Sequence, residues 1–118
     1  MRKDNVRDYA TAAFREYARL GCPAPEVIPR ERDAALIADL MAVAECLRIL
    51  RVENEGYVAD AVCAVYFASP GVPLQKGDIG ARVSSFARAC PASEREVYRW
   101  LKRARVRFAA VRGLRVRK

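Results

Sequence analysis

Apolar residues recur at three- and four-residue steps through most of this chain, and glycine and proline interrupt them only rarely. A step of three to four residues is the period of one face of an α-helix, whereas a half-buried strand alternates every second residue. No segment shows a strand period, so the expected fold class is all-α. The spacing and the breakers between the runs predict helices over residues 4–20, 30–51, 57–67, 74–90 and 93–111.

Two of these helices carry specific signals at their starts. Residues 93–96, Ser-Glu-Arg-Glu, form a capping box, in which Ser93 and Glu96 each bind an otherwise unpaired backbone N–H. Glu31 and Asp33 are expected in the first turn of the second helix, where negative charge suits the helix dipole. The expected buried stripe of that second helix is Ala34, Ile37, Leu40, Met41, Ala44, Leu47 and either Leu50 or Arg51.

The expected organisation divides the chain near residue 56. Residues 1–56 are expected to form a helical arm for dimerisation or for binding a partner, and residues 57–118 a DNA-binding unit with a helix-turn-helix. The second helix also has apolar side chains outside its main stripe, Leu36 and Ile49. We therefore expect a homodimer that is joined mainly through this helix and the first one.

The positive charge of the protein is confined to one segment. The formal net charge is +8, yet residues 1–91 contain 12 basic and 12 acidic residues. Residues 92–118 contain ten lysines and arginines against Glu94 and Glu96, so they carry the whole excess. A concentrated basic segment is typical of a protein that binds a polyanion. A solvated basic tail is the alternative that composition leaves open.

The helix predicted over residues 93–111 has two different faces. One is an apolar seam that should pack on the protein, formed by Val97, Leu101, Ala104, Phe108 and Val111. Trp100 lies at the edge of this seam and is expected to be a core residue. The opposite face is basic, and because Glu94 and Glu96 are both used at the helix start, its cations are expected to lack acidic partners. A basic helix that follows a shorter helix and a tight turn has the layout of helix-turn-helix DNA-binding proteins.

Position along this helix separates two expected kinds of DNA contact. An arginine suits base reading, because its planar group can bond O6 and N7 of guanine together. The outward side chains of the first half would reach base edges in the major groove: Arg95, Tyr98, Arg99 and Lys102. The remaining basic side chains and the hydroxyl at the cap would bind phosphates: Ser93, Arg103, Arg105, Arg107, Arg112, Arg115, Arg117 and Lys118.

Short motifs in this part of the chain carry a family resemblance. Residues 77–79, Gly-Asp-Ile, open the first of the two helices and Ser93 precedes the second, which contains Val97, Leu101, the run Arg103-Ala104-Arg105 and Phe108. With these features, residues 74–111 resemble region four of bacterial sigma factors and the small phage transcriptional regulators that share it. The 14 residues from Ile79 to Ser93 exceed the compact pattern by about two helical turns, so either the first helix is extended or the turn is enlarged.

The resemblance implies a function that the basic helix indicates independently. The expected protein is a sequence-specific transcriptional regulator of a phage or prophage, which binds double-stranded DNA through the helix over 93–111. The resemblance also allows a contact with RNA polymerase. Two alternatives stay open. One is a phage structural or packaging protein that binds nucleic acid without reading its sequence. The other is an RNA-binding accessory protein that uses the arginine-rich end over residues 112–118.

Other classes of function find little support in the residues present. The chain has no histidine, the commonest general base, and its carboxylates are scattered, so no enzyme activity is expected. Cys22, Cys46, Cys63 and Cys90 show no paired short spacing, so we expect buried reduced thiols, with no metal and no cofactor. The chain has no run of about 18 apolar residues and no apolar stretch typical of a signal peptide. A cytoplasmic protein without a membrane partner is therefore expected.

Overall fold

Five α-helices and one short 3₁₀ turn form the part of the chain that the computed structural model describes, which is residues 5–31, 33–72 and 74–114. No strand occurs in these residues, so the all-α prediction is confirmed. In chain order the elements are α1 (Asn5–Arg19), η1 (Ile28–Arg30), α2 (Ala34–Val52), α3 (Gly56–Tyr66), α4 (Asp78–Ala89) and α5 (Glu94–Arg112).

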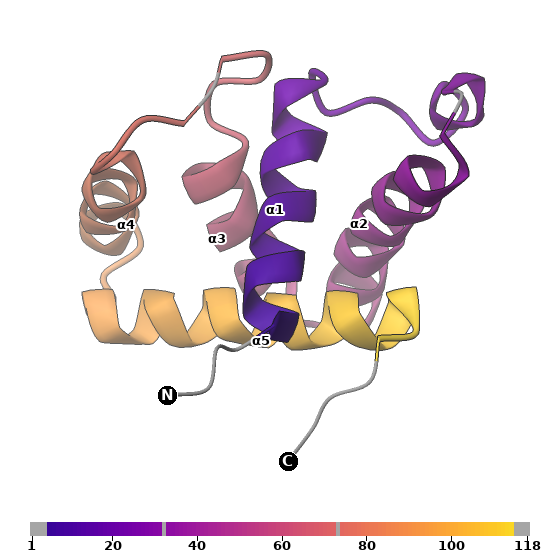
Figure 1. Ribbon diagram of the computed structural model, residues 1–118. Coiled ribbons are helices and arrows are strands. Elements are labelled where there is room, and N and C mark those ends of the chain that lie inside the picture. The colour runs from indigo at the N-terminus through magenta and orange to yellow at the C-terminus, as the bar shows by residue number, and fades with distance from the viewer. Residues whose placement is uncertain (1–4, 32, 73, 115–118) are drawn as a thin grey trace.

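Helix α5 is the element on which the other helices pack. It lies across one side of the molecule, and α1, α2, α3 and α4 all lie on the same side of it and contact it (Figure 1). The apolar seam expected on this helix is the surface that they cover, since Val97, Leu101, Ala104 and Phe108 are almost completely buried. The opposite side of α5 is consequently left facing away from the protein.

The core is one continuous cluster that draws on all five helices. Phe14 of α1 lies at its centre, with its ring centroid 5.4 Å from that of Tyr66, 6.3 Å from that of Phe67 and 5.6 Å from that of Phe108. Residues before and after position 56 therefore share the same core. The division at residue 56 is not a boundary in the packing, and it stays a prediction about function.

Helix α2 begins at Ala34, four residues later than expected, because Asp33 is its N-cap. The Asp33 carboxylate accepts hydrogen bonds from the backbone N–H groups of Ala35 at 2.8 Å and Leu36 at 3.2 Å. These bonds satisfy donors that have no partner inside the helix. The expectation that Glu31 lies in the first turn is wrong, since Glu31 is extended and follows η1.

The buried face of α2 is also rotated from the expected stripe. Leu40 is buried as expected, and of the alternatives Leu50 and Arg51 it is Leu50 that is buried. Ala34 and Met41 are exposed, and the other buried positions are Ala42, Val43 and Cys46. Helix α2 packs against α1, α3 and α5 together and is apolar on most of its surface. Spacing alone could not select the buried side for such a helix, because several stripes were equally apolar.

Helix α4 begins at Asp78, as the motif of residues 77–79 indicates, and the broader prediction that the helix begins at residue 74 is wrong. Gly77 is the N-cap residue and has a φ of +90°, a left-handed conformation that favours glycine. The Asp78 carboxylate accepts a hydrogen bond from the backbone N–H of Gln75 at 2.7 Å, which holds the preceding turn. Leu74 consequently lies in the loop before the helix, partly buried against the core.

The predicted start and end of the last helix are confirmed in detail. The Ser93 hydroxyl accepts from the Glu96 N–H, and the Glu96 carboxylate accepts from the Ser93 N–H, each at 3.1 Å. Gly113 ends the helix with a φ of +81°. Both signals are local, which is why the sequence predicts them well.

Removing this cap should weaken the fold measurably. We expect Ser93→Ala to lower the free energy of unfolding by about 1 kcal/mol, because an N–H of α5 loses its partner. Urea unfolding followed by circular dichroism would measure the loss. Ser85→Ala is the matched control, because Ser85 is exposed in the middle of α4, and it should change stability by less than about 0.5 kcal/mol. Equal losses in the two variants would contradict a stabilising cap.

Candidate nucleic-acid interface

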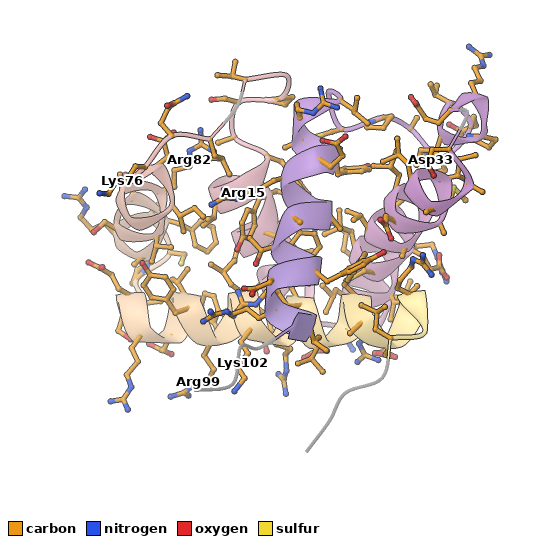
Figure 2. The ribbon with its side chains drawn as sticks, viewed as in Figure 1. Arg15, Asp33, Lys76, Arg82, Arg99 and Lys102 are labelled. Carbon is orange, nitrogen blue, oxygen red and sulfur yellow. The ribbon has the colours of Figure 1, made fainter. Side chains whose placement is uncertain are left out.

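The first half of α5 presents three cations on the side that faces away from the protein. Arg95, Arg99 and Lys102 are exposed and follow one another at steps of four and three residues. Figure 2 shows Arg99 and Lys102 extending from α5 away from the other helices. None of the three has an ion pair or side-chain hydrogen bond with any described residue. This row, which we call the outward face, therefore carries charge that the described part of the protein does not neutralise.

The fourth predicted base-reading residue, Tyr98, lies beside this row at the junction of α4 and α5. Its side chain is 46% exposed, and a Cβ placed on Gly80 of α4 would lie 3.9 Å from its hydroxyl oxygen. The side chain therefore leans toward the start of α4.

The two helices that carry this junction are joined by a short turn. Residues 90–93 connect α4 to α5, and the Ser84 hydroxyl donates a hydrogen bond of 2.8 Å to the Glu94 carboxylate across the turn. Helix α4 contains 12 residues, so most of the interval between Ile79 and Ser93 is helical. Helices α3, α4 and α5 all contact one another, so the junction has a fixed support.

The second half of α5 is different, because three of its arginines, Arg103, Arg107 and Arg112, bind carboxylates of the protein. Arg103 forms an ion pair with Glu55 at 2.8 Å, and Arg107 forms one with Glu53 at 2.7 Å. Both acids belong to the turn between α2 and α3, which the fold brings alongside α5. The expectation that the basic face lacks acidic partners is wrong for these residues, because it considered only acids in the same segment.

The same correction applies at the end of the helix. Arg112 donates to the Asp39 carboxylate of α2 at 2.7 Å, and the Tyr9 hydroxyl of α1 donates to the same oxygen at 2.7 Å. Hydrogen bonding to Asp39 raises the pKa of Tyr9, with burial as the second cause. This network ties α1, α2 and α5 together, so Arg112 already has a structural role.

The remaining predicted phosphate ligands fall into three groups. The Ser93 hydroxyl is occupied by the capping box. Arg105 is half-buried and lines a hollow together with Arg7 of α1, a residue that sequence reasoning did not connect with this site. Nothing near Arg7 in the sequence indicates this proximity to α5, which arises only from the packing of α1 on α5. Arg115, Arg117 and Lys118 lie outside the described residues.

Trp100 is part of the protein interior, as expected. It is partly buried against the core, with its ring centroid 5.1 Å from that of Tyr57 and 6.4 Å from that of Phe86. Both contacts are edge-to-face, an arrangement that aromatic pairs favour. Trp100 of α5 therefore packs against α3 and α4, on the protein side of the outward face.

The four cysteines are unpaired, and only Cys46 is fully buried. Its thiol donates to the backbone carbonyl of Ala104 in α5 at 3.5 Å, and burial raises its pKa to about 12. Cys22, Cys63 and Cys90 are half-buried. Across the described ranges, no three histidine, cysteine, aspartate or glutamate side chains are grouped as a metal site would need.

Thiol reactivity should distinguish Cys46 from the other cysteines. We expect it to react with Ellman's reagent at least about 100-fold more slowly than the others in the native protein, because reaction requires the core to open. The slow phase should vanish in a Cys46→Ala variant, and all four thiols should react at similar rates in denaturant. A native Cys46 that reacts as fast as Cys90 would contradict the burial of this thiol.

Comparison of the chain with family models, with curated proteins and with solved structures finds no match. Among the described helices, none is both long and apolar enough to cross a membrane.

Proposed function

We propose that this protein binds double-stranded DNA through the outward face of α5 and acts as a sequence-specific regulator of transcription. The observation that carries the proposal is the row formed by Arg95, Arg99 and Lys102, which is exposed and has no acidic partner in the described chain. An exposed helix fits the major groove of B-DNA, which is about 12 Å wide.

The arrangement around this row supports the proposal. The turn of residues 90–93 has the length usual in a helix-turn-helix, and α4 leads into α5 as the first helix of such a motif does. The three cations of the outward face lie in the first half of α5, the half that meets base edges in such motifs. The resemblance of residues 74–111 to region four of sigma factors leads to the same function and adds RNA polymerase as a second partner to test.

A dimer is part of the proposal, because one recognition helix makes few base contacts and two-fold symmetry doubles them. Helix α2 offers apolar side chains that the monomer does not fully bury, namely Leu36, Met41 and Ile49. We therefore place the dimer contact on α2, together with α1. Light scattering at tens of micromolar protein should give twice the mass of the chain, and a monomeric mass would remove this part of the proposal.

Selection from random duplex DNA tests the proposed function directly. We expect the full chain to enrich one sequence, and to bind that sequence more tightly than a scrambled duplex at every salt concentration. On the scrambled duplex, log Kobs should fall with log salt with a slope of at least about 3 in magnitude, since three cations release counterions. Equal binding to all duplexes would favour a packaging protein, and tighter binding to RNA would favour the RNA-binding alternative.

A further inference from the structure

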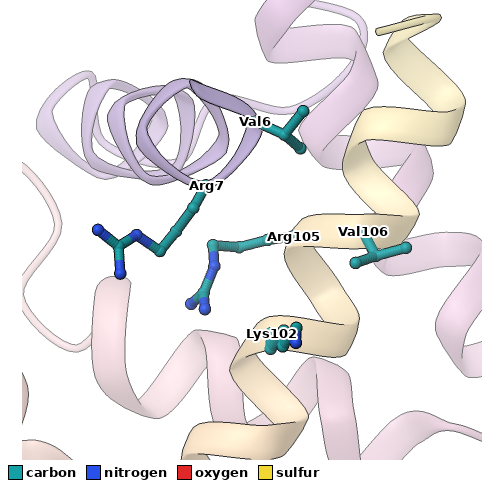
Figure 3. A pocket seen from close by; sticks show the side chains of 5 residues that line it. All are labelled: Val6, Arg7, Lys102, Arg105 and Val106. Atoms are coloured by element: carbon teal, nitrogen blue, oxygen red, sulfur yellow. The ribbon is translucent and has the colours of Figure 1, made fainter. Parts of the chain in front are cut away.

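One apolar side chain lies in line with the cations of the outward face. Val106 follows Lys102 by four residues, and its side chain is 49% exposed. At about 100° per residue, the three cations and Val106 fall within a sector of about 60° of the helix, with Val106 near its middle. Figure 3 shows Val106 one turn after Lys102, where both side chains border a hollow between α1 and α5. A ligand that covers the cations therefore reaches Val106 as well.

Neither packing nor helix stability accounts for a valine at this position. The buried seam of α5, which includes Val97 and Phe108, lies on the opposite side of the helix. A β-branched side chain is also a poorer helix former than the lysine and arginines around it. Single apolar side chains are common on protein surfaces, so exposure alone does not indicate a ligand. What distinguishes Val106 is its place among cations that have no partner in the described chain.

The major groove of DNA offers one apolar group to such a side chain, the C5 methyl of thymine. Guanine, adenine and cytosine present hydrogen-bond donors and acceptors there. A valine side chain forms no hydrogen bond, so opposite those three bases it would cover polar groups without pairing them. Opposite thymine, two apolar groups leave water together, which is favourable. Thymine is therefore the base whose groove edge matches a valine.

We propose that Val106 contacts the C5 methyl of a thymine in the major groove and selects that base at one position of the DNA site. This inference rests on the proposed function, which places α5 in the groove. Val106 is seven residues after Arg99, which is about 10 Å along the helix and about three base pairs along the duplex. The thymine should therefore lie about three base pairs from the base that Arg99 contacts. RNA carries uracil, which lacks this methyl, so the contact also favours DNA over RNA.

The test replaces each thymine of the selected duplex in turn with deoxyuridine, which pairs like thymine and lacks only the methyl. With the full wild-type chain, we expect a position at which the replacement weakens binding about 4-fold, the effect of burying one methyl group. Val106→Ser should bind the thymine and deoxyuridine forms of that position equally, at about the wild-type affinity for deoxyuridine. Serine suits the test because it has no methyl group and a helix propensity close to that of valine.

Val27→Ser is the matched control, because Val27 is 45% exposed and precedes η1, which packs on α2. This variant should keep the wild-type preference for thymine at every position, and circular dichroism should show that both variants are folded. If wild-type protein selects a sequence and Val106→Ser keeps the same thymine preference as the control, the thymine contact is overturned while the proposed function stands. If the wild-type chain selects no sequence, the proposed function fails and the contact fails with it.

Discussion

Replacing Phe108 with alanine should lower the free energy of unfolding by about 3–5 kcal/mol, the largest stability effect we expect from one substitution. The Phe108 ring is completely buried, with its centroid 5.6 Å from that of Phe14 and 6.3 Å from that of Tyr9. Alanine would lose these contacts and leave a cavity between α1 and α5. Urea unfolding at constant pH, followed by circular dichroism, measures the difference.

Val106→Ala is the control for Phe108→Ala, because Val106 belongs to the same helix and is 49% exposed. It should change stability by less than about 0.5 kcal/mol. A Phe108→Ala protein as stable as this control would contradict the packing of α1 against α5. Unfolding of α5 alone, with the other helices still folded, would contradict the single core.

The Arg95→Ala/Arg99→Ala variant should lose most of the specific DNA affinity. Each arginine on the outward face is expected to contribute about 1–3 kcal/mol on the selected duplex, so the pair contributes about 2–6 kcal/mol if the two effects add. The fold should be unaffected, because both side chains are exposed and have no partner in the described chain. Titration of selected and scrambled duplexes at several salt concentrations measures the loss.

The Arg15→Ala/Arg30→Ala variant controls for the change in charge. It removes the same two charges from exposed positions on α1 and η1, away from α5. We expect it to weaken binding only slightly and to leave the preference for the selected duplex intact. If both variants weaken binding to both duplexes equally, the outward face does not read sequence, and the non-specific packaging or RNA-binding function takes its place.

The features that sequence reasoning predicted correctly are those encoded by neighbouring residues. The capping box at Ser93, the stop at Gly113 and the apolar seam of α5 each depend on spacings of a few residues, so a single helix determines them. The start of α2 was missed because Asp33 caps the helix instead of lying inside it. The buried side of α2 was missed because three helices pack around it, and their positions are a property of the whole fold.

Neighbouring residues likewise predict only part of the candidate site. The exposure of Arg95, Tyr98, Arg99 and Lys102 followed from the position of the seam on one helix. The partners of Arg103, Arg107 and Arg112 did not, because their carboxylates come from α2 and the turn after it. Arg7 was missed for the same reason, since only the tertiary packing brings α1 to α5.

The position of α5 beneath the four other helices has a consequence for synthesis on the ribosome. Helices α1 to α4 precede α5 in the chain, so they emerge from the ribosome before the helix that covers their apolar faces. Contacts such as Phe14 with Phe108 join residues from opposite ends of the described chain, and they form only after nearly all of it has been translated. Until then the nascent protein exposes the surfaces that chaperones recognise. A ribosome that stops before α5 would therefore release a chain for degradation, and not a smaller folded protein.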